Sequence, residues 1–178
     1  MDVPRLITDR LVLREFRESD FDAYAAMMAD PEVTRFLADG TPLGRADAWR
    51  QMAMFAGHWH LRGFGVWAVE ERESGRFIGR IGCMDPEGWP GFEVAYTLAR
   101  PHWGKGYARE GAAVALRYAR VVLGRERVIS IIRPGNVGSI RVAESLGATR
   151  DGEAEFYGSP ALLYVYPAPD HPANGASR

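Results

Sequence analysis

Residues 103–108, Trp-Gly-Lys-Gly-Tyr-Ala, have the types and spacing of a phosphate-binding turn. Gly104 and Gly106 punctuate a connection between a predicted strand and a predicted helix. The start of a helix exposes unpaired N–H groups and carries a partial positive charge. Glycines there allow the backbone to approach a phosphate without a Cβ in the way. The pattern indicates a site for a phosphorylated cofactor, although Gly-x-Gly at such a place is often only a turn.

Two nucleotide-binding motifs fail on these residues. A P-loop requires Ser or Thr directly after its lysine, to bind magnesium, but Gly106 follows Lys105 in this chain. A dinucleotide fingerprint requires a third glycine at the position that Arg109 occupies. A nucleotide-dependent phosphotransferase is therefore disfavoured.

The histidines and the cysteine carry weaker signals. Cys83 is the single cysteine, which excludes an intrachain disulfide, and its apolar strand pattern is typical of a buried core residue. His58 and His60 flank Trp59 and are expected to lie off the apolar stripe of their helix, with no Cys or acid at metal-ligand spacing. His102 precedes the glycine turn and is most simply a turn histidine. No metal site is predicted.

A second segment carries a family resemblance. Residues 136–148 read N-V-G-S-I-R-V-A-E-S-L-G-A and follow a short apolar strand and a Pro-Gly turn. They match N-x-x-S-x-[RK]-x-x-E-x-x-G-[FA], so the chain resembles the RimJ/RimL-like branch of the GNAT superfamily of acyl-CoA-dependent N-acyltransferases. Residues 103–110 match that branch's W-G-x-G-[YL]-A-x-E, and residues 93–96 match E-[IV]-[GA]-Y. The opening motifs T-x-R-L-x-L-R and D-P-E-V occur at residues 8–14 and 30–33.

The resemblance implies the α+β GNAT fold: a single mixed, mostly antiparallel sheet of about seven strands, flanked by about four helices. In that fold two neighbouring central strands splay apart, and the pantetheine arm of CoA lies in the gap. We expect one GNAT acyltransferase domain over residues 1–167. Residues 168–178, which are rich in Pro, Ala and Asn, are expected to form a flexible tail.

The implied activity is acetyl-CoA-dependent N-acetyl transfer, directly to a primary amine in a ternary complex. The acceptor is a protein N-terminal α-amine or a small-molecule amine, and the alternative is a non-catalytic CoA-binding sensor or interaction module. The fold builds its acceptor cleft from residues 34–42, 49–60 and 157–163. The acids near these segments are few, namely Asp39, Asp47, Glu153 and Glu155. A denser acidic cleft would be expected for polyamines or aminoglycosides.

The resemblance assigns the cofactor to the glycine turn and the preceding strand. Backbone amides from Gly104 to Ala108 are expected to hold the pyrophosphate, while Lys105 adds positive charge or is a solvated loop residue. The Val94 or Ala95 amide is a candidate for polarising the thioester. The expected cofactor-binding residues are Val94, Ala95, Tyr96, Leu98, Trp103, Gly104, Lys105, Gly106, Tyr107, Ala108, Asn136 and Arg141.

Two of these positions carry alternatives. Trp103 is expected to pack the turn, since Trp is common there in this branch although most GNAT members have Arg or Gln. Arg141 and Glu144, three residues apart, are expected to form a surface ion pair, unless Arg141 reaches the cofactor's phosphates.

Glu93, Asn136 and Ser139 are the candidate catalytic residues. An amine must lose its proton before it attacks, and related enzymes place a carboxylate base at Glu93; the alternative is an exposed strand residue that points away. Ser139 is the candidate proton donor to the thiolate, because the position of the tyrosine used by many members is Ala143 here. Its hydroxyl could equally bond the helix backbone. Asn136 shares a helix face with Ser139 and is also a favourable N-cap.

The positioning elements follow from periodicity. A first strand is predicted at residues 6–7 and 11–14, and further strands at 64–71, 77–84, 92–98, 128–132, 148–156 and 162–166. Helices are predicted at residues 20–29, 45–61, 106–122 and 136–146. Within the strand at 92–98, Glu93 and Ala95 should share one face, and Val94 and Tyr96 the other.

The composition agrees with a single packed domain. The chain has 178 residues, of which 47% are hydrophobic. A net charge of −1 gives no basic footprint for nucleic acid. The N-terminal residues lack an apolar signal core, and no apolar run approaches the ~18 residues of a membrane span. With one cysteine, these features predict a cytoplasmic protein in a reducing compartment without a membrane or nucleic-acid partner. A homodimer is compatible with the family.

Overall fold

The computed structural model describes residues 2–168, and residues 1 and 169–178 lie outside the described part. Eight strands form one sheet in the order β1-β2-β3-β4-β5-β6-β8-β7. The strands are β1 (Leu6–Ile7), β2 (Leu11–Arg14), β3 (Val66–Glu71), β4 (Arg76–Met84), β5 (Glu93–Leu98), β6 (Ile129–Ile132), β7 (Thr149–Phe156) and β8 (Ser159–Val165). The helices are α1 (Phe21–Met28), α2 (Pro31–Thr34), α3 (Arg45–Arg62), α4 (Tyr107–Val121) and α5 (Val137–Ser145). The predicted tail, apart from its first residue, lies outside the described residues.

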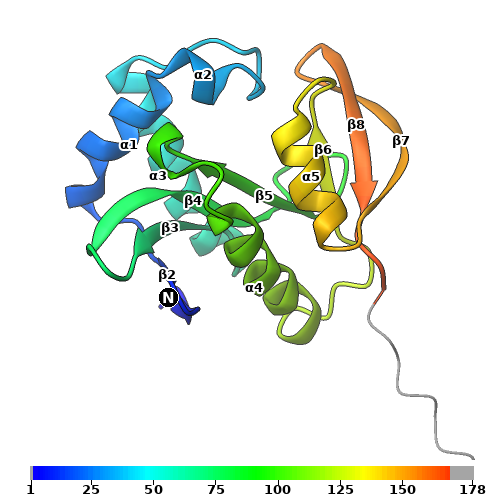
Figure 1. Cartoon of the computed structure of the whole chain (residues 1–178), viewed down its shortest axis with the longest axis horizontal. Coiled ribbons are helices and arrows are strands. Elements are labelled where there is room, and N and C mark those ends of the chain that lie inside the picture. The colour runs from blue at the N-terminus through cyan, green and yellow to red at the C-terminus, as the bar shows by residue number, and fades with distance from the viewer. Residues whose placement is uncertain (1, 169–178) are drawn as a thin grey trace, which may run out of the picture.

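The sheet changes character at its centre. Neighbouring strands are antiparallel throughout, except that β5 and β6 are parallel. Six residue pairs join β4 to β5, whereas the single pair Glu93↔Ile129 joins β5 to β6. The two strands then diverge, so that α5, β6, β7 and β8 form one side of the molecule in Figure 1 and the longer N-terminal part forms the other. The predicted splayed pair is therefore β5 and β6.

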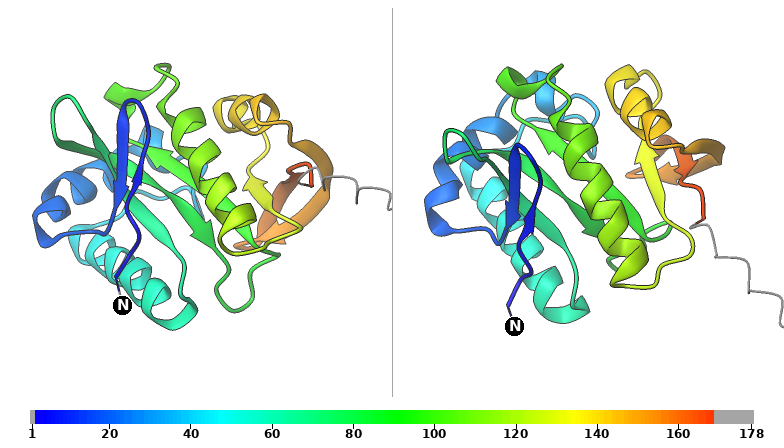
Figure 2. Two further views of the ribbon diagram at one scale, coloured as in Figure 1. Left: turned by 90° about the horizontal axis from the view of Figure 1, so that it is seen from below. Right: turned by 60° about the horizontal axis from the view of Figure 1, so that its bottom comes forward.

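Helices cover both faces of the sheet, with α4 and α5 on one face and α1 and α3 on the other (Figure 2). The helix α4 presents Ala112, Ala115 and Ala119, all fully buried, to the strands. These small side chains allow the helix to lie close to β4 and β5, so its N-terminus is fixed at the end of β5. The second core lies between α1, α3 and the opposite face, where Val66 and Met84 are buried.

The structure has more elements than the sequence indicated. Residues 6–14 form two strands and not one, and the single turn α2 was missed although Asp30 caps it and Pro31 occupies its first position. The last strand begins at Ser159 and not at residue 162, because β7 and β8 form a hairpin. Tyr157 and Gly158 at its tip have φ of 49° and 66°. The sequence did not predict this turn, because two positive φ angles are usually indicated by Asn-Gly or Asp-Gly and not by Tyr-Gly.

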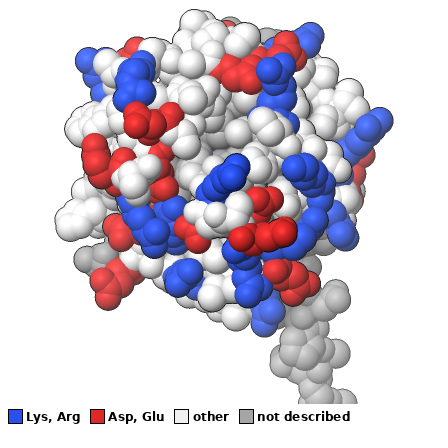
Figure 3. Space-filling model, turned by 60° about the vertical axis from the view of Figure 1, so that its left-hand side comes forward, with Lys and Arg blue, Asp and Glu red and all other residues white. Residues whose placement is uncertain are grey.

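The surface charge is mixed. Acidic and basic side chains alternate over the face shown in Figure 3, without a large patch of one sign. Within residues 2–168, no helix combines the length and the apolar character needed to cross a membrane. The same residues contain no cluster of His, Cys, Asp and Glu suited to a metal ion.

Candidate active site

The junction of β5 and β6 is held together by side chains. Ser130 Oγ on β6 donates to the Val94 carbonyl on β5 at 2.6 Å, and both groups are buried. The Ile131 main-chain N–H on β6 donates to Glu93 Oε1 at 3.1 Å. These two bonds replace ladder hydrogen bonds that diverging strands cannot make. These bonds hold β5 and β6 together at one end, while the strands remain separated beyond it.

The main chain of Tyr96 faces this opening. Alternate residues of a strand direct their main-chain groups to opposite neighbours, and the Val94 carbonyl faces β6. Ala95 therefore faces β4, where it lies opposite Gly82, while Tyr96 faces β6 beyond the last pair. The Tyr96 hydroxyl donates to the Ser139 carbonyl on α5 at 2.9 Å, and burial raises the pKa of Tyr96, which keeps it protonated. The Val94 and Ala95 amides were the candidates for polarising the thioester. The Ala95 amide is directed toward β4 and not toward the opening.

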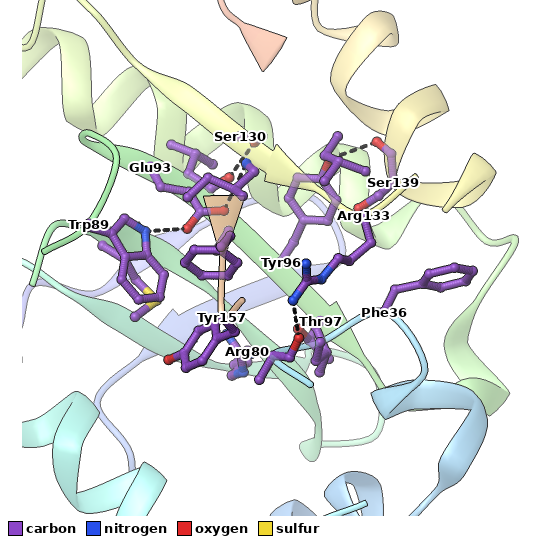
Figure 4. A pocket seen from close by; sticks show the side chains of 18 of the residues that line it. Phe36, Arg80, Trp89, Glu93, Tyr96, Thr97, Ser130, Arg133, Ser139 and Tyr157 are labelled. Carbon is purple, nitrogen blue, oxygen red and sulfur yellow. Dashed lines mark hydrogen bonds between the residues drawn. The ribbon is translucent and has the colours of Figure 1, made fainter. Parts of the chain in front are cut away.

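Glu93 is a buried carboxylate at the edge of a pocket. Only 6% of the residue is exposed, and Trp89 Nε1 donates to its Oε2 at 2.7 Å. Burial raises the pKa of Glu93, while the hydrogen bonds from Trp89 and Ile131 and the charge of Arg80 oppose that rise. Figure 4 shows the carboxylate with its tryptophan at one side of the pocket. An exposed glutamate pointing away from the cleft is excluded, and the role of base stays a prediction.

The pocket encloses about 140 Å³ and joins the three segments expected to form the acceptor cleft. It is lined by Phe36, Leu37 and Ala38 after α2, by Gln51, Met54 and Phe55 of α3, and by Phe156 and Tyr157 of the hairpin. Asp39, Asp47, Glu153 and Glu155, the acids noted from the sequence, do not line it. Among the described lining residues, Glu93 supplies the one carboxylate.

Several lining residues were missed from the sequence, namely Arg80, Trp89, Arg133 and Phe156. Arg80 left a signal, because it is the one charged residue in the otherwise apolar part of β4 that follows Arg76. Arg133 follows β6 and donates to the carbonyls of Pro160, at 3.2 Å, and Ala38, so it ties the hairpin to the loop after α2. These contacts join residues distant in sequence, which local patterns do not reveal.

The predicted pair on α5 lines the same pocket. Asn136 Oδ1 accepts from the Ser139 main-chain N–H at 3.1 Å, so the N-cap interpretation of Asn136 is confirmed. The Ser139 hydroxyl has no hydrogen-bond partner within residues 2–168, which excludes the alternative that it bonds the helix backbone. Ala143, at the position of the usual tyrosine, is fully buried.

Arg141 and Glu144 are both exposed on α5. No ion pair joins these two described side chains within 4.0 Å, so the predicted surface pair is wrong. Each side chain is free to remain solvated, because an exposed pair gains little from a fixed geometry.

The glycine turn has a backbone conformation that favours glycine. Gly104 and Gly106 have φ of 73° and 81°. A Cβ on Gly104 would meet nothing within 4 Å, so the positive φ requires glycine, and close packing does not. The helix α4 begins at Tyr107 without a side-chain cap. Its first N–H groups are therefore available to an anion, which fits the phosphates of CoA.

A clamp from the N-terminal strands fixes this turn. Arg10 Nη1 donates to the Lys105 carbonyl at 2.8 Å, and its Nε donates to Glu110 Oε2 at 2.7 Å. Burial raises the pKa of Glu110, but hydrogen bonds from Thr8 and Arg10 outweigh it and lower the pKa overall. The sequence analysis did not find this clamp, since its partners lie about a hundred residues apart.

Trp103 closes the end of β5. Its Nε1 donates to the Leu98 carbonyl at 2.7 Å, which anchors the indole to the end of β5, although the side chain is partly exposed. The neighbouring Lys105 side chain is exposed, in agreement with either of its two interpretations.

The remaining reactive groups are structural. Cys83 is fully buried, as predicted. His58 was expected off the apolar stripe but is buried, because its two ring nitrogens bond the Phe64 carbonyl and the Asp85 N–H. Burial lowers the pKa of His58, which favours the neutral ring. His102 ends the short 3₁₀ turn after β5 and does not line the pocket.

Comparisons with known proteins agree with this geometry. The family described as Acetyltransferase (GNAT) domain matches residues 10–149. A Bacillus licheniformis protein named uncharacterized N-acetyltransferase p20 is 31% identical, over 83% of this chain and 83% of its own. The crystal structure of an acetyltransferase from Agrobacterium tumefaciens str. C58 is 32% identical with a TM-score of 0.84, over 93% of this chain and 95% of that chain.

A ribosomal-protein-S5-alanine acetyltransferase from Vibrio fischeri has the same fold. Its crystal structure superimposes with a TM-score of 0.71 over 94% of this chain and 98% of that chain. At 19% identity the likeness concerns the fold alone.

Proposed function

We propose that this chain, which belongs to the GNAT family of acetyltransferases, moves an acetyl group from acetyl-CoA directly to a primary amine in a ternary complex. The observation that carries the proposal is the position of Glu93. It is a buried carboxylate that touches both the open β5–β6 junction and the pocket between α3 and the β7–β8 hairpin. A donor in the junction and an acceptor in the pocket would meet beside it.

The cofactor-binding residues follow from the backbone. The N–H groups from Gly104 to Ala108, at the uncapped start of α4, would hold the pyrophosphate. The main chain of Tyr96 and Leu98 would pair with the pantetheine amides, because this edge of β5 has lost its neighbour. Acetyl-CoA supplies the activated acetyl group.

The chain's own side chains would move the protons. Glu93, directly or through a water, takes the proton from the acceptor's ammonium, which frees the nitrogen lone pair for attack on the acetyl carbonyl. The C–S bond then breaks. The Ser139 hydroxyl, which has no hydrogen-bond partner within residues 2–168, would give a proton to the departing sulfur and regain one from the attacking nitrogen, which loses its second proton as the amide forms. Asn136 fixes the start of α5 and so places Ser139 at the pocket wall.

We further propose membership of the RimJ/RimL-like branch, based on the motifs at residues 103–110 and 136–148. The reducing compartment indicated by a single cysteine supports a cytoplasmic enzyme. A homodimer stays a proposal for the oligomeric state.

A thiol-release assay with acetyl-CoA tests this function. The acceptor panel contains N-terminal peptides, lysine peptides, polyamines, aminoglycosides and amino acids. We expect thiol release with at least one class, together with mass-spectrometric acetylation of its amine. CoA binding without thiol release for any amine would contradict the proposal and favour the non-catalytic CoA-binding module.

A further inference from the structure

Arg80 is a buried cation without a partner. It lies in the middle of β4 and is 7% exposed. Its side chain forms no ion pair with any acid that the structure describes, and its Nε is buried without a partner. The neighbouring polar group is the Tyr24 hydroxyl. The guanidinium carbon lies 5.0 Å from the ring centroid of Phe55, a contact that stabilises a cation only modestly.

The groups around Arg80 do not neutralise it. Burial raises the pKa of the Tyr24 hydroxyl to about 12, so this neighbour is uncharged near neutral pH. The Glu93 carboxylate is held by Trp89 and Ile131 and forms no ion pair with Arg80 within 4.0 Å. The charge of Arg80 acts on Glu93 at a distance, but no carboxylate of the described chain forms an ion pair with it.

Another buried arginine of this protein provides the contrast. Arg14 is 5% exposed, and its guanidinium makes ion pairs at 2.7 Å with Asp20 and at 2.8 Å with Glu70. Buried charges in proteins are normally paired in this way, because an unpaired one reduces stability. Arg80 departs from the pattern inside a pocket, where a ligand can supply the missing anion.

The register of β4 and β5 places Arg80 relative to Glu93. Residues directly opposite in an antiparallel pair share a face, and Arg80 lies opposite Thr97 while Met84 lies opposite Glu93. Gly82 and Ala95 form the pair between them, so small residues separate the cation from the carboxylate. The two positions are offset by four residues along β5, which is about 13 Å between their backbones. Figure 4 shows both side chains at the same pocket.

The rest of the lining agrees with an anionic ligand that has an apolar body. Arg133 adds a second positive charge, and its hydrogen bonds to other described residues go to carbonyl groups, at Pro160 and Ala38. The walls are aromatic, with Phe55, Trp89, Phe156 and Tyr157. Two guanidinium groups against one buried carboxylate favour anions over polycations.

We propose that Arg80 binds a carboxylate of the acceptor, so that the acceptor is a primary amine that also carries a carboxylate, held with its amine toward Glu93. The inference deepens the proposed acetyl transfer and rests on it for the fate of the amine. A guanidinium suits this role because its fork can bind both carboxylate oxygens.

The test compares acceptors in matched pairs that differ only in the carboxylate. One set is phenylalanine, phenylalaninamide and phenethylamine, and the other is ω-amino acids of increasing length beside the alkylamines that lack the acid. Acetylation is measured for the wild type, Arg80→Met, Arg80→Lys and the control Arg117→Met, which changes an exposed arginine on α4. Affinities for CoA, 3-phenylpropionate and octanoate are measured by calorimetry or NMR, since these bind without turnover.

The expected result is specific to the acid. The wild type prefers the carboxylate member of a pair, and Arg80→Met lowers its kcat/KM by at least about tenfold, with less than about threefold change for the uncharged partner. Arg80→Lys loses the bidentate geometry and falls in between. Arg80→Met should unfold at the same temperature as the wild type or higher, because it removes an unpaired buried charge. If Arg80→Met does not fold, the same comparison of acceptor pairs is made with Arg80→Lys.

The outcomes separate this inference from the proposed function. Carboxylate binding that Arg80→Met weakens, without acetylation of any amine, would support the anion site and contradict the acetyl transfer. If kcat/KM is the same with and without the acceptor carboxylate, or if Arg80→Met lowers it equally for both members of a pair, the inference is overturned and the proposed acetyl transfer stands. A loss of CoA affinity in Arg80→Met would also overturn it, because the anion would then belong to the cofactor. Absence of both acetylation and carboxylate binding would overturn both.

Discussion

The two neighbours of β5 are joined to it in different ways. On one side, six residue pairs bind β4 to β5 through a continuous backbone ladder. On the other side, one residue pair and two side-chain bonds, from Ser130 to Val94 and from Ile131 to Glu93, join β5 to β6. The ladder with β4 uses the main-chain groups of the β5 residues that face β4, whereas the junction with β6 leaves the main-chain groups of Tyr96 without a strand partner. The difference shows how one strand can serve as a rigid wall and as a binding edge.

This contrast predicts which damage affects activity and which affects stability. The closed side of β5 belongs to the core, with Ile81 and Cys83 of β4 fully buried. The open side carries the glycine turn at its end and the pocket beside it. Changes on the open side should therefore reduce activity more than stability, and changes on the closed side should do the reverse.

The largest effect on activity is expected from Gly106→Asp. It places a side chain at φ of 81° and a negative charge at the start of α4, where the cofactor's phosphates would bind. Acetyl-CoA affinity should fall by at least about a hundredfold in calorimetry. The control is Gly124→Asp, at the other end of α4, which has φ of 62° and open space around it. Unchanged affinity in Gly106→Asp, or an equal loss in both, would refute the assignment of the turn.

The next effect is expected from Glu93→Gln, with Glu144→Gln on the exposed face of α5 as the control. Loss of a general base should lower kcat by about 10²-fold or more with little change in CoA affinity. Burial raises the pKa of Glu93, and a base must be deprotonated, so wild-type kcat should decline on the acid side at a higher pH than for a free glutamate. The variant should lack this acid limb. A pH profile of kcat that the substitution leaves unaltered would exclude Glu93 as the base.

A smaller effect separates the two sides of β5. Ser130→Ala leaves the buried Val94 carbonyl without its donor, which should destabilise the fold by about 1–3 kcal/mol and raise the KM for acetyl-CoA several-fold. Ile81→Ala, on the closed side, should cost more stability, about 2–5 kcal/mol, with kcat and KM of the folded protein unchanged. Denaturant unfolding and steady-state kinetics measure both. If Ile81→Ala changes KM as much as Ser130→Ala, the contrast fails.

The smallest effect is expected from Ser139→Ala. The hydroxyl lines the pocket, but the cap from Asn136 uses only the Ser139 main chain, so the fold should be unaffected. Water can replace the hydroxyl as proton donor, so turnover should fall by about tenfold at most. The turnover of the variant is measured as thiol release at saturating acetyl-CoA. Turnover equal to that of the wild type would show that water, and not Ser139, donates the proton to the thiolate.

What the sequence could predict follows from how local each feature is. The glycine turn and the Asn136 cap depend on residues within a few positions, and both were found. The splayed strands came from the family resemblance, because a lost ladder leaves no local pattern. The position of Arg80 depends on the tertiary register of β4 and β5, and it was missed. Trp89 was also missed, although its partner Glu93 is only four residues away. The burial of His58 was also missed, since it depends on bonds to Phe64 and Asp85 that periodicity does not reveal.

The most direct test of the open edge is an amide NMR titration of the ¹⁵N-labelled protein with CoA. The account predicts that the largest shifts occur at Tyr96, whose main chain faces the opening, and at Gly104, Gly106 and Tyr107 at the start of α4. The amides of Ala95 and Thr97, which face the β4 ladder, should shift less than that of Tyr96. Binding that leaves Tyr96 and the glycine turn unshifted, or that shifts Ala95 and Thr97 more than Tyr96, would contradict the account.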